Sequence, residues 1–495
     1  MMRSIFFYII SLETGVRLNK MKTDTIAAIA TAMSNSGIGI IRVSGSEAVH
    51  IVNEIYHSKN GRKALSDYET HTIHYGFIYD GEEMIDEVMV SVMLAPKSYT
   101  TEDTVEINCH GGVLVMNRIL ETLLKNGARM AEPGEFTKRA FLNGRIDLSR
   151  AEAVMDMIHS KNEYALKASV KQLKGSVSSI IKELREKILY EIAFIESALD
   201  DPEHISLDGY YDNLSVKVDA LLGSLKKLLD SADNGKLMKE GISTVIVGKP
   251  NAGKSSLLNL LVGEEKAIVT DIAGTTRDIL EESIRLHGIG LNIIDTAGIR
   301  STEDVVEKIG VEKAKKYAED ADLIIYVVDS SVELDENDED IISMIFGKKV
   351  IILLNKTDLE PVVSEKMLRN KISEKQICRE ELLNKELDSS IRIIKTSTRE
   401  NTGIDEFENI IKDMFFRGEL ESNDEVMITN MRHKEAISDA FQSISMVKQS
   451  IEAGMPEDFL SIDLMSAYTS LGYIIGEEVG EDLVNEIFSK FCMGK

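Results

Sequence analysis

The residues best suited to chemistry form a glycine-rich segment near the middle of the chain. Residues 248–255 read Gly-Lys-Pro-Asn-Ala-Gly-Lys-Ser, the G-x-x-x-x-G-K-S pattern of a phosphate-binding loop. A β-branched run at 243–247 precedes the loop and an apolar run at 256–261 follows it, so a buried strand and a helix are predicted to flank it. Backbone N–H groups would then face a phosphate, Lys254 would reach the β- and γ-phosphates, and the Ser255 hydroxyl would bind Mg²⁺. The flanking elements disfavour a chance match.

Four further segments follow in the order that a GTP site needs. In residues 274–278 a threonine, which we assign as Thr276, can complete the Mg²⁺ shell. Residues 295–298 (Asp-Thr-Ala-Gly) end a strand-like run and offer an acidic partner for the metal and a glycine N–H for the γ-phosphate. Residues 355–358 (Asn-Lys-Thr-Asp) end another strand-like run. The Asp358 carboxylate can accept both N–H donors of guanine, a pair of donors that adenine lacks. Residues 397–399 would cover the base edge.

These segments predict a doubly wound α/β domain with its ligand at the carboxyl ends of the strands. The predicted GTP contacts are Asn251, Ala252, Gly253, Lys254, Ser255, Ser256, Thr270, Asp271, Ile272, Ala273, Gly274, Thr275, Thr276, Asp295, Thr296, Ala297, Gly298, Asn355, Lys356, Asp358, Ser397, Thr398 and Arg399.

The residue after Gly298 is Ile299, where Ras-type enzymes carry a glutamine that orients the attacking water. Isoleucine cannot orient water, so hydrolysis needs a neighbouring acid, a cation or a partner chain. The following loop holds four acids: Glu303, Asp304, Glu307 and Glu312. Their spacing alone favours an ordinary solvated, charged loop.

Length and charge limit the class of protein. A chain of 495 residues predicts two to four domains, and a net charge of −26 disfavours a generally adhesive nucleic-acid surface. The three cysteines (Cys109, Cys378 and Cys492) are far apart and odd in number, which favours a reducing, cytoplasmic compartment over a disulfide framework. No stretch is long enough to predict a membrane span. Residues 1–20 are interpreted as a disordered extension or a misassigned start.

Two other kinds of domain surround the nucleotide motifs. Short apolar runs and turns from Thr25 to about residue 140 predict an α+β domain, in which Cys109 and His110 are interpreted as a packed strand end, because one Cys and one His are too few to bind zinc. From Asp147, apolar residues recur every three or four positions, as in long amphipathic helices. The first of these helices bears four lysines that could contact phosphate: Lys161, Lys167, Lys171 and Lys174.

The segment Asp200-Asp201-Pro202-Glu203 marks a break between helices, and residues 430–491 are again predicted to be helical. Within the nucleotide domain, residues 350–354 form the strand-like run before Asn355, and the acidic run 332–340 is predicted to lie on the surface. Since the first strand and last helix of a nucleotide domain can lie close together, we interpret the two helical stretches as one domain that the nucleotide domain interrupts. The predicted parts are 21–143 (α+β), 144–238 and 421–495 (all-α), and 239–420 (an inserted α/β P-loop GTPase domain).

Taken together, the chain resembles the MnmE (TrmE) family of tRNA-modification GTPases from about residue 21 to its end. The resemblance rests on the phosphate loop, on residues 274–278 and on several boxes elsewhere. These boxes are 24–26, 39–45, 99–103, 109–112, 134–137, 139–144 and the terminal Cys492-Met493-Gly494-Lys495. Departures are Ser-Asn-Ser-Gly at 34–37 in place of a more basic, glycine-rich loop, and Thr398 in place of alanine.

The resemblance implies a folate-binding N-terminal domain that dimerises. Arg42, Glu106, Arg145 and Lys495 would contact 5-formyl- or methylene-tetrahydrofolate, the one-carbon donor. An FAD-containing MnmG-type partner would join it in a heterotetramer, and the pair would place an aminomethyl-type group on C5 of the wobble uridine of tRNA. Cys492 matches the tail cysteine needed for modification.

The resemblance also implies a route to hydrolysis. Asn251 would ligate a K⁺ ion with backbone oxygens around Thr270, Ile272 and Thr275 when two G domains meet, and Glu307 falls on the catalytic acid that orients water. The competing hypothesis is a ribosome-assembly or regulatory GTPase that binds RNA and modifies nothing. The terminal box and the N-terminal boxes weigh against it.

Overall fold

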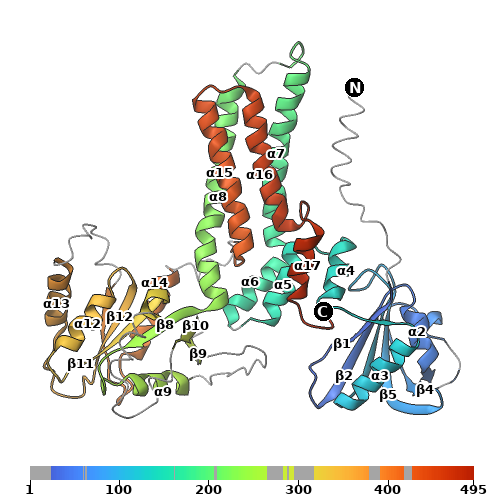
Figure 1. Cartoon of the computed structure of the whole chain (residues 1–495), viewed down its shortest axis with the longest axis horizontal. Helices are drawn as coiled ribbons and strands as arrows, with labels where there is room; N and C mark the ends of the chain where they lie inside the picture. The colour runs from blue at the N-terminus through green and yellow to red at the C-terminus, as the bar shows by residue number, and fades with distance from the viewer. Residues whose placement is uncertain are drawn as a thin grey trace. The chain divides into compact units, whose positions relative to one another are not determined.

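A computed structural model describes residues 24–59, 61, 64–160, 162–205, 209–264, 282–286, 289–294, 317–377, 391–416 and 426–495 (Figure 1). The chain divides into two compact units, which we describe separately. The first holds Met1–Met155, Lys171–Gly223 and Ala436–Lys495, and the second holds Asp156–Val170 and Ser224–Glu435.

The N-terminal part of the first unit is a seven-stranded sheet in the order β3-β4-β5-β6-β2-β1-β7. Its elements are β1 (Ile26–Ile29), β2 (Ser36–Ser44), α2 (Ala48–Ile55), β3 (Tyr56–Ser58), β4 (Thr72–Asp80), β5 (Glu83–Met93), β6 (Thr104–Gly111), α3 (Val113–Lys125) and β7 (Arg129–Met130). Helices α2 and α3 cover one face (Figure 1), where Ile41, Val90 and Ile107 are fully buried. Because side chains alternate along a strand, the neighbouring residues Arg42, Met89 and Glu106 lie on the opposite face. Phe136 of α4 (Glu135–Leu142) packs against Ile26 and Ala28 at the β1 end of that face, whereas exposed Ile73 and Met89 lie on its β4–β5 part, which we call the helix-free face.

The remaining helices make up the rest of the first unit and, through residues 156–170, 224–240 and 431–435, part of the second. Their bounds are α4 (Glu135–Leu142), α5 (Leu148–Ile158), α6 (Glu163–Leu173), α7 (Ser176–Asp200), α8 (Tyr210–Glu240), α15 (Met431–Glu452), α16 (Glu457–Ile475) and α17 (Glu481–Ser489). Helices α7, α8, α15 and α16 run side by side (Figure 1). Helix α7 ends just before Pro202, as the sequence predicts, and none of the helices in the described ranges is both long and apolar enough to cross a membrane.

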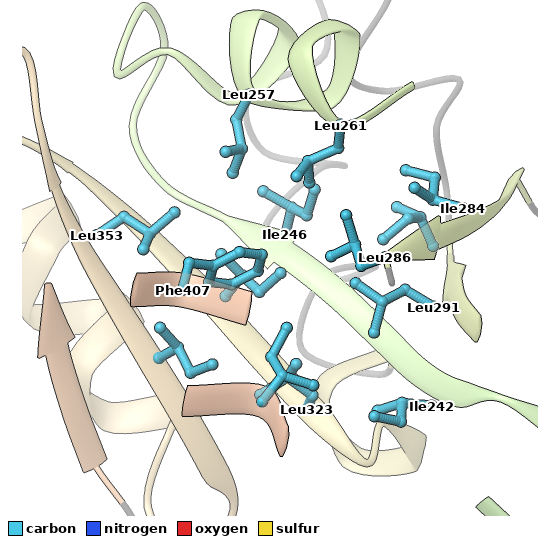
Figure 2. Packing of buried hydrophobic residues seen from close by; sticks show 14 of the residues in the cluster. Ile242, Ile246, Leu257, Leu261, Ile284, Leu286, Leu291, Leu323, Leu353 and Phe407 are labelled. Carbon is cyan, nitrogen blue, oxygen red and sulfur yellow. The ribbon is translucent and has the colours of Figure 1, made fainter. Parts of the chain in front are cut away.

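The second unit is built on a six-stranded sheet in the order β13-β12-β11-β8-β10-β9, parallel except for β9. Its elements are β8 (Ile242–Val247), α9 (Lys254–Glu264), β9 (Glu282–Leu286), β10 (Ile289–Ile293), β11 (Leu323–Asp329), α12 (Glu336–Met344), β12 (Lys349–Asn355), α13 (Glu365–Ile377), β13 (Ile391–Lys395) and α14 (Ile404–Phe416). Both faces of the sheet are covered by apolar side chains. Figure 2 shows one of these cores, where Leu257 of α9 and Phe407 of α14 pack near Ile246 of β8.

The predicted fold class is confirmed: an α+β sheet domain, a helical domain and an α/β domain with the phosphate loop after its β8 strand. One detail of the prediction is wrong. The acidic run 332–340 was expected on the surface, but Asp338 is only 1% exposed. Its carboxylate is neutralised by contacts described below.

Candidate functional site

The phosphate loop connects the end of β8 to the start of α9 and requires its two glycines. Gly248 has φ +151° and Gly253 has φ +103°, a region that L side chains rarely adopt. A Cβ atom at Gly248 would lie 2.4 Å from the Val327 carbonyl oxygen, and one at Gly253 would lie 2.1 Å from Asn355 Nδ2. The loop can therefore approach both neighbours only with glycine at these positions.

Lys254 is folded over the loop. Its Nζ donates to the carbonyl oxygens of Gly248 (2.6 Å) and Lys249 (2.8 Å). Burial lowers the pKa of Lys254, which makes an anionic ligand a favourable partner for the ammonium group. The loop thus offers backbone N–H groups, the start of α9 and one buried cation to a phosphate.

A second lysine, which the sequence analysis missed, ties the loop to α12. Lys249 Nζ lies 2.7 Å from Asp338 Oδ2 and 3.1 Å from Asp335 Oδ2. The Tyr326 hydroxyl donates to the other Asp338 oxygen (2.7 Å). Asp335 caps α12 and Asp338 is the third residue of this capping box, so the D-x-x-D spacing was the signal that could have placed Asp338 at a helix start.

The residues predicted to recognise the base lie on two loops that hydrogen bonds join. Ser397 Oγ donates to Asp358 Oδ1 (2.7 Å), which fixes the carboxylate that the sequence assigns to guanine. Asn355 Nδ2 donates to the Ala252 carbonyl (2.9 Å), and its Oδ1 accepts from Thr398 N–H (3.2 Å). Asn355 therefore joins the phosphate loop to the loop at residues 397–399, so the two ends of the predicted nucleotide site are held at a fixed distance.

Lys356 adopts φ +63° and pairs with Asp329 at the end of β11, with Nζ 2.5 Å from Oδ2. Although burial opposes ionisation, hydrogen bonds from Lys356 and Ser331 lower the pKa of Asp329. This ion pair anchors the base-recognition loop to the sheet.

The remaining nucleotide residues cannot be placed. Thr270, Asp271, Ile272, Ala273, Gly274, Thr275, Thr276, Asp295, Thr296, Ala297, Gly298 and Glu307 lie outside the described residues, as do Lys161 and Cys378. Of the predicted K⁺ ligands only Asn251 is described, exposed in the loop with φ +61°. Of the predicted Mg²⁺ ligands only Ser255 is described, in the first turn of α9.

A second group of predicted residues meets on the N-terminal sheet, on the face opposite α2 and α3. Arg42 and Glu106 are cross-strand partners, and Arg42 Nε lies 2.8 Å from Glu106 Oε1. Arg42 also donates to the Gly494 carbonyl (2.9 Å). Its guanidinium lies 5.7 Å from the Tyr99 ring centroid and 5.6 Å from that of Phe136.

The C-terminal tail is docked beside this pair. Gly134 N–H donates to the Cys492 carbonyl (3.3 Å), and the half-turn at Gly494 (φ +81°) brings its backbone against Ile29. Phe488 and Phe491 are buried, whereas Cys492 is exposed. The structure therefore brings Arg42, Glu106 and the tail residues before Lys495 together from distant parts of the sequence.

Arg145 reaches the same place through Tyr99, with its guanidinium 4.8 Å from the ring centroid. Tyr99 was missed as a site residue, although its box was recognised. An adjoining groove of about 710 Å³ is lined by His71, Met93, Pro96, Lys97, Ser98, Tyr99, Thr101, Asn143, Gly144 and Arg145.

Buried charges hold this region in place. Arg139 bonds Glu102 (3.0 Å) and Glu135 (2.9 Å), and Glu135 also bonds Arg129 (2.7 Å). Burial opposes ionisation of Glu135, but hydrogen bonds from these two arginines lower its pKa. The boxes 99–103 and 134–137 therefore carry the charges that position Tyr99 and the start of α4.

Cys109 and His110 lie at the end of β6, where Cys109 is packed as predicted and the His110 side chain is exposed. Cys109 is 4% exposed and burial raises the pKa of its thiol to about 11, so it is a poor nucleophile. His110 bonds Asp86 (2.7 Å), which raises its pKa. Within the described part of the chain, no three His, Cys, Asp or Glu side chains form a metal-binding group.

The α/β fold, the phosphate loop and the guanine-type motif define a P-loop GTPase domain. Two family models extend this to the rest of the chain: "GTP-binding protein TrmE N-terminus" matches residues 25–145, and "MnmE helical domain" matches residues 148–492.

Near full-length relatives agree. The tRNA modification GTPase MnmE of Lachnoclostridium phytofermentans is 56% identical over 96% of this chain and 100% of its own length. The proteins of the same name from Clostridioides difficile (48%; 95% of this chain, 99% of the relative) and Enterococcus faecalis (47%; 96% and 99%) are also similar. The chain belongs to the MnmE family.

Among solved structures, the G domain of the T. maritima FeoB iron transporter covers 35% of this chain and 98% of its own at 24% identity. The TM-score is 0.23, so this likeness carries no weight here.

Proposed function

We propose that the chain binds and hydrolyses GTP and uses this activity in the modification of tRNA at C5 of the wobble uridine. The linkage of both ends of the nucleotide site through Asn355 supports GTP binding, because Asp358 and Lys254 then sit at a fixed separation. The relatives' shared name, tRNA modification GTPase, supports the choice of substrate.

In this proposal Mg²⁺ is held by Ser255 and Thr276, and K⁺ by Asn251 with backbone oxygens of Thr270, Ile272 and Thr275. Glu307 orients the water in place of the absent glutamine. The exposed position of Asn251 in the phosphate loop suits a ligand shared with a second G domain.

The docked C-terminal tail is the observation that supports the proposed role in tRNA modification. The Arg42 contact with Gly494 joins residues 452 positions apart and brings the segment that bears Cys492 beside Glu106. We propose that Arg42, Glu106, Arg145 and Lys495 hold a tetrahydrofolate one-carbon donor. Cys492 then acts in the reaction that an FAD-containing MnmG-type partner completes, in the cytoplasm and in a heterotetramer.

We propose the helix-free face of the N-terminal sheet as the homodimer contact. Ile73 is 67% exposed and Met89 is 50% exposed on adjoining strands, beside half-exposed Tyr75. Apolar side chains clustered on an uncovered sheet face favour association.

The proposal also includes the domain limits 21–143, 144–238, 239–420 and 421–495.

The first test is GTP hydrolysis by the purified chain in K⁺ and in Na⁺ at equal ionic strength, with association followed by light scattering. Strong K⁺ dependence with association is expected, and Asn251→Ala should remove the difference between the two salts. Equal slow rates in both salts would contradict the K⁺ mechanism and favour a GTPase that depends on an external activator.

A further inference from the structure

The groove beside Arg145 is cationic in a strongly acidic protein. Its lining includes His71, Lys97 and Arg145 and contains no Asp or Glu, although the chain carries a net charge of −26. Over the ranges that the structure describes, no carboxylate forms a salt bridge with Lys97 or Arg145, and both are exposed. The two acids that follow Thr101 in the sequence have partners outside the groove: Glu102 bonds Arg139, and Asp103 accepts from Ala95 N–H (2.8 Å).

The groove wall is held in an unusual backbone conformation. Thr101 has φ +62° and His71 has φ +63°, a left-handed region that is strained for a β-branched residue such as threonine. The neighbours supply the restraint. Thr100 bonds Ser44 (2.7 Å), and His71 N–H donates to the Val92 carbonyl (2.7 Å). Such strain, held by surrounding contacts, is typical of a preformed binding surface.

The groove continues directly from the predicted folate residues. The Tyr99 ring lines the groove and its centroid lies 4.8 Å from the Arg145 guanidinium and 5.7 Å from that of Arg42, which pairs with Glu106. A ligand whose ring system lies at Arg42 and Glu106, and whose far end reaches Arg145, would extend the remainder of its chain into the groove. The far end of folate is a glutamate, and further γ-linked glutamates can extend it, each adding one carboxylate.

We propose that this groove binds the oligo-γ-glutamate tail of the folate donor. The inference rests on the proposed folate function and deepens it. The carboxylates pair with Lys97 and Arg145, while the Thr101 hydroxyl and the second amide hydrogen of Asn143 offer hydrogen-bond donors along the wall. A groove of about 710 Å³ suits a short anionic chain.

The test compares binding of 5-formyltetrahydrofolate monoglutamate and triglutamate to the full chain by calorimetry. Wild-type protein should bind the triglutamate about tenfold more tightly, and the preference should shrink as salt rises. Lys97→Ala should leave the monoglutamate affinity unchanged and remove most of the preference. Lys125→Ala, the same change of charge at an exposed lysine on α3 that covers the opposite face of the sheet, should keep it.

Equal affinity for the two folates in the wild-type protein would overturn the groove assignment and leave folate binding intact. Absence of binding by either folate would overturn the proposed folate function and the groove with it. If Lys97→Ala weakens tRNA binding but keeps the triglutamate preference, the groove contacts RNA and the inference is wrong.

Discussion

At the scale of single residues, the two lysines of the phosphate loop have different roles. Lys254 is free to exchange carbonyl partners for a phosphate, whereas Lys249 is committed to the buried carboxylate of Asp338. A buried carboxylate that loses its cationic partner has only its remaining hydrogen bonds to stabilise its charge. We therefore expect Lys249 to position the loop through its pairing with α12.

We expect Lys249→Met to weaken GTP binding by roughly tenfold, about 1.4 kcal/mol, because the loop loses its connection to α12. Fluorescent-nucleotide titration measures the affinity, and hydrogen exchange across 248–254 should rise in parallel. Asp335→Asn is the matched control, since it neutralises the exposed partner and keeps a residue able to cap α12. Unchanged affinity in Lys249→Met would show that the tether has no role.

The tail cysteine gives a second prediction at this scale. Cys492→Ser should keep GTP hydrolysis, because the exposed thiol lies in a different compact unit from the phosphate loop, and should abolish wobble-uridine modification in cells. Cys109→Ser is the comparison, since its buried thiol donates to the Gly39 carbonyl and takes no part in the site. Normal modified-nucleoside levels in Cys492→Ser would remove the tail from the mechanism.

At the scale of elements, docking of α17 and the tail depends on the turn before α4. Gly134 has φ +70°, and a Cβ there would lie 2.6 Å from the Phe488 carbonyl oxygen and 2.7 Å from Phe491 Cβ. The same glycine donates its N–H to Cys492. The helix start thus provides both the space and the hydrogen bond for the tail.

Gly134→Ala should release the tail, which hydrogen exchange would detect as lost protection over residues 481–495. Gly81→Ala is a matched control, because Gly81 has a similar φ of +63° but nothing within 4 Å of an added Cβ. The backbone cost of about 1–2 kcal/mol is then common to both variants, and only Gly134→Ala adds the clash. Equal protection in the two variants would mean that the tail does not depend on this contact.

At the scale of the whole molecule, the proposed functions depend on copies of the chain meeting. Ile73→Lys places a charge among the exposed apolar side chains of β4 and β5 and should shift the protein towards monomer in light-scattering chromatography. Val216→Lys, at an equally exposed apolar residue of α8 (70% against 67%), should leave the oligomeric state unchanged. A dimer that survives Ile73→Lys would move the contact to another surface.

Much of the chemistry was determined by the sequence itself. The phosphate loop and the base motifs follow strands because a glycine loop at a strand end is a local property of about ten residues. Strands at 243–247 and 350–354 and the break at Pro202 were predicted for the same local reasons, and the structure confirms them. The pattern also requires glycine at positions 248 and 253, where the structure shows that a Cβ atom would collide with Val327 and Asn355, respectively.

Only the tertiary structure decided which distant residues meet. The contacts of Lys249 with Asp338, of Arg42 with Gly494 and of Arg145 with Tyr99 join segments that no spacing rule connects. The burial of Asp338 could not be read from its acidic surroundings, because it depends on a tyrosine and a lysine brought in by other strands and loops. Local patterns set what each segment is, and packing determines which partner satisfies its charges.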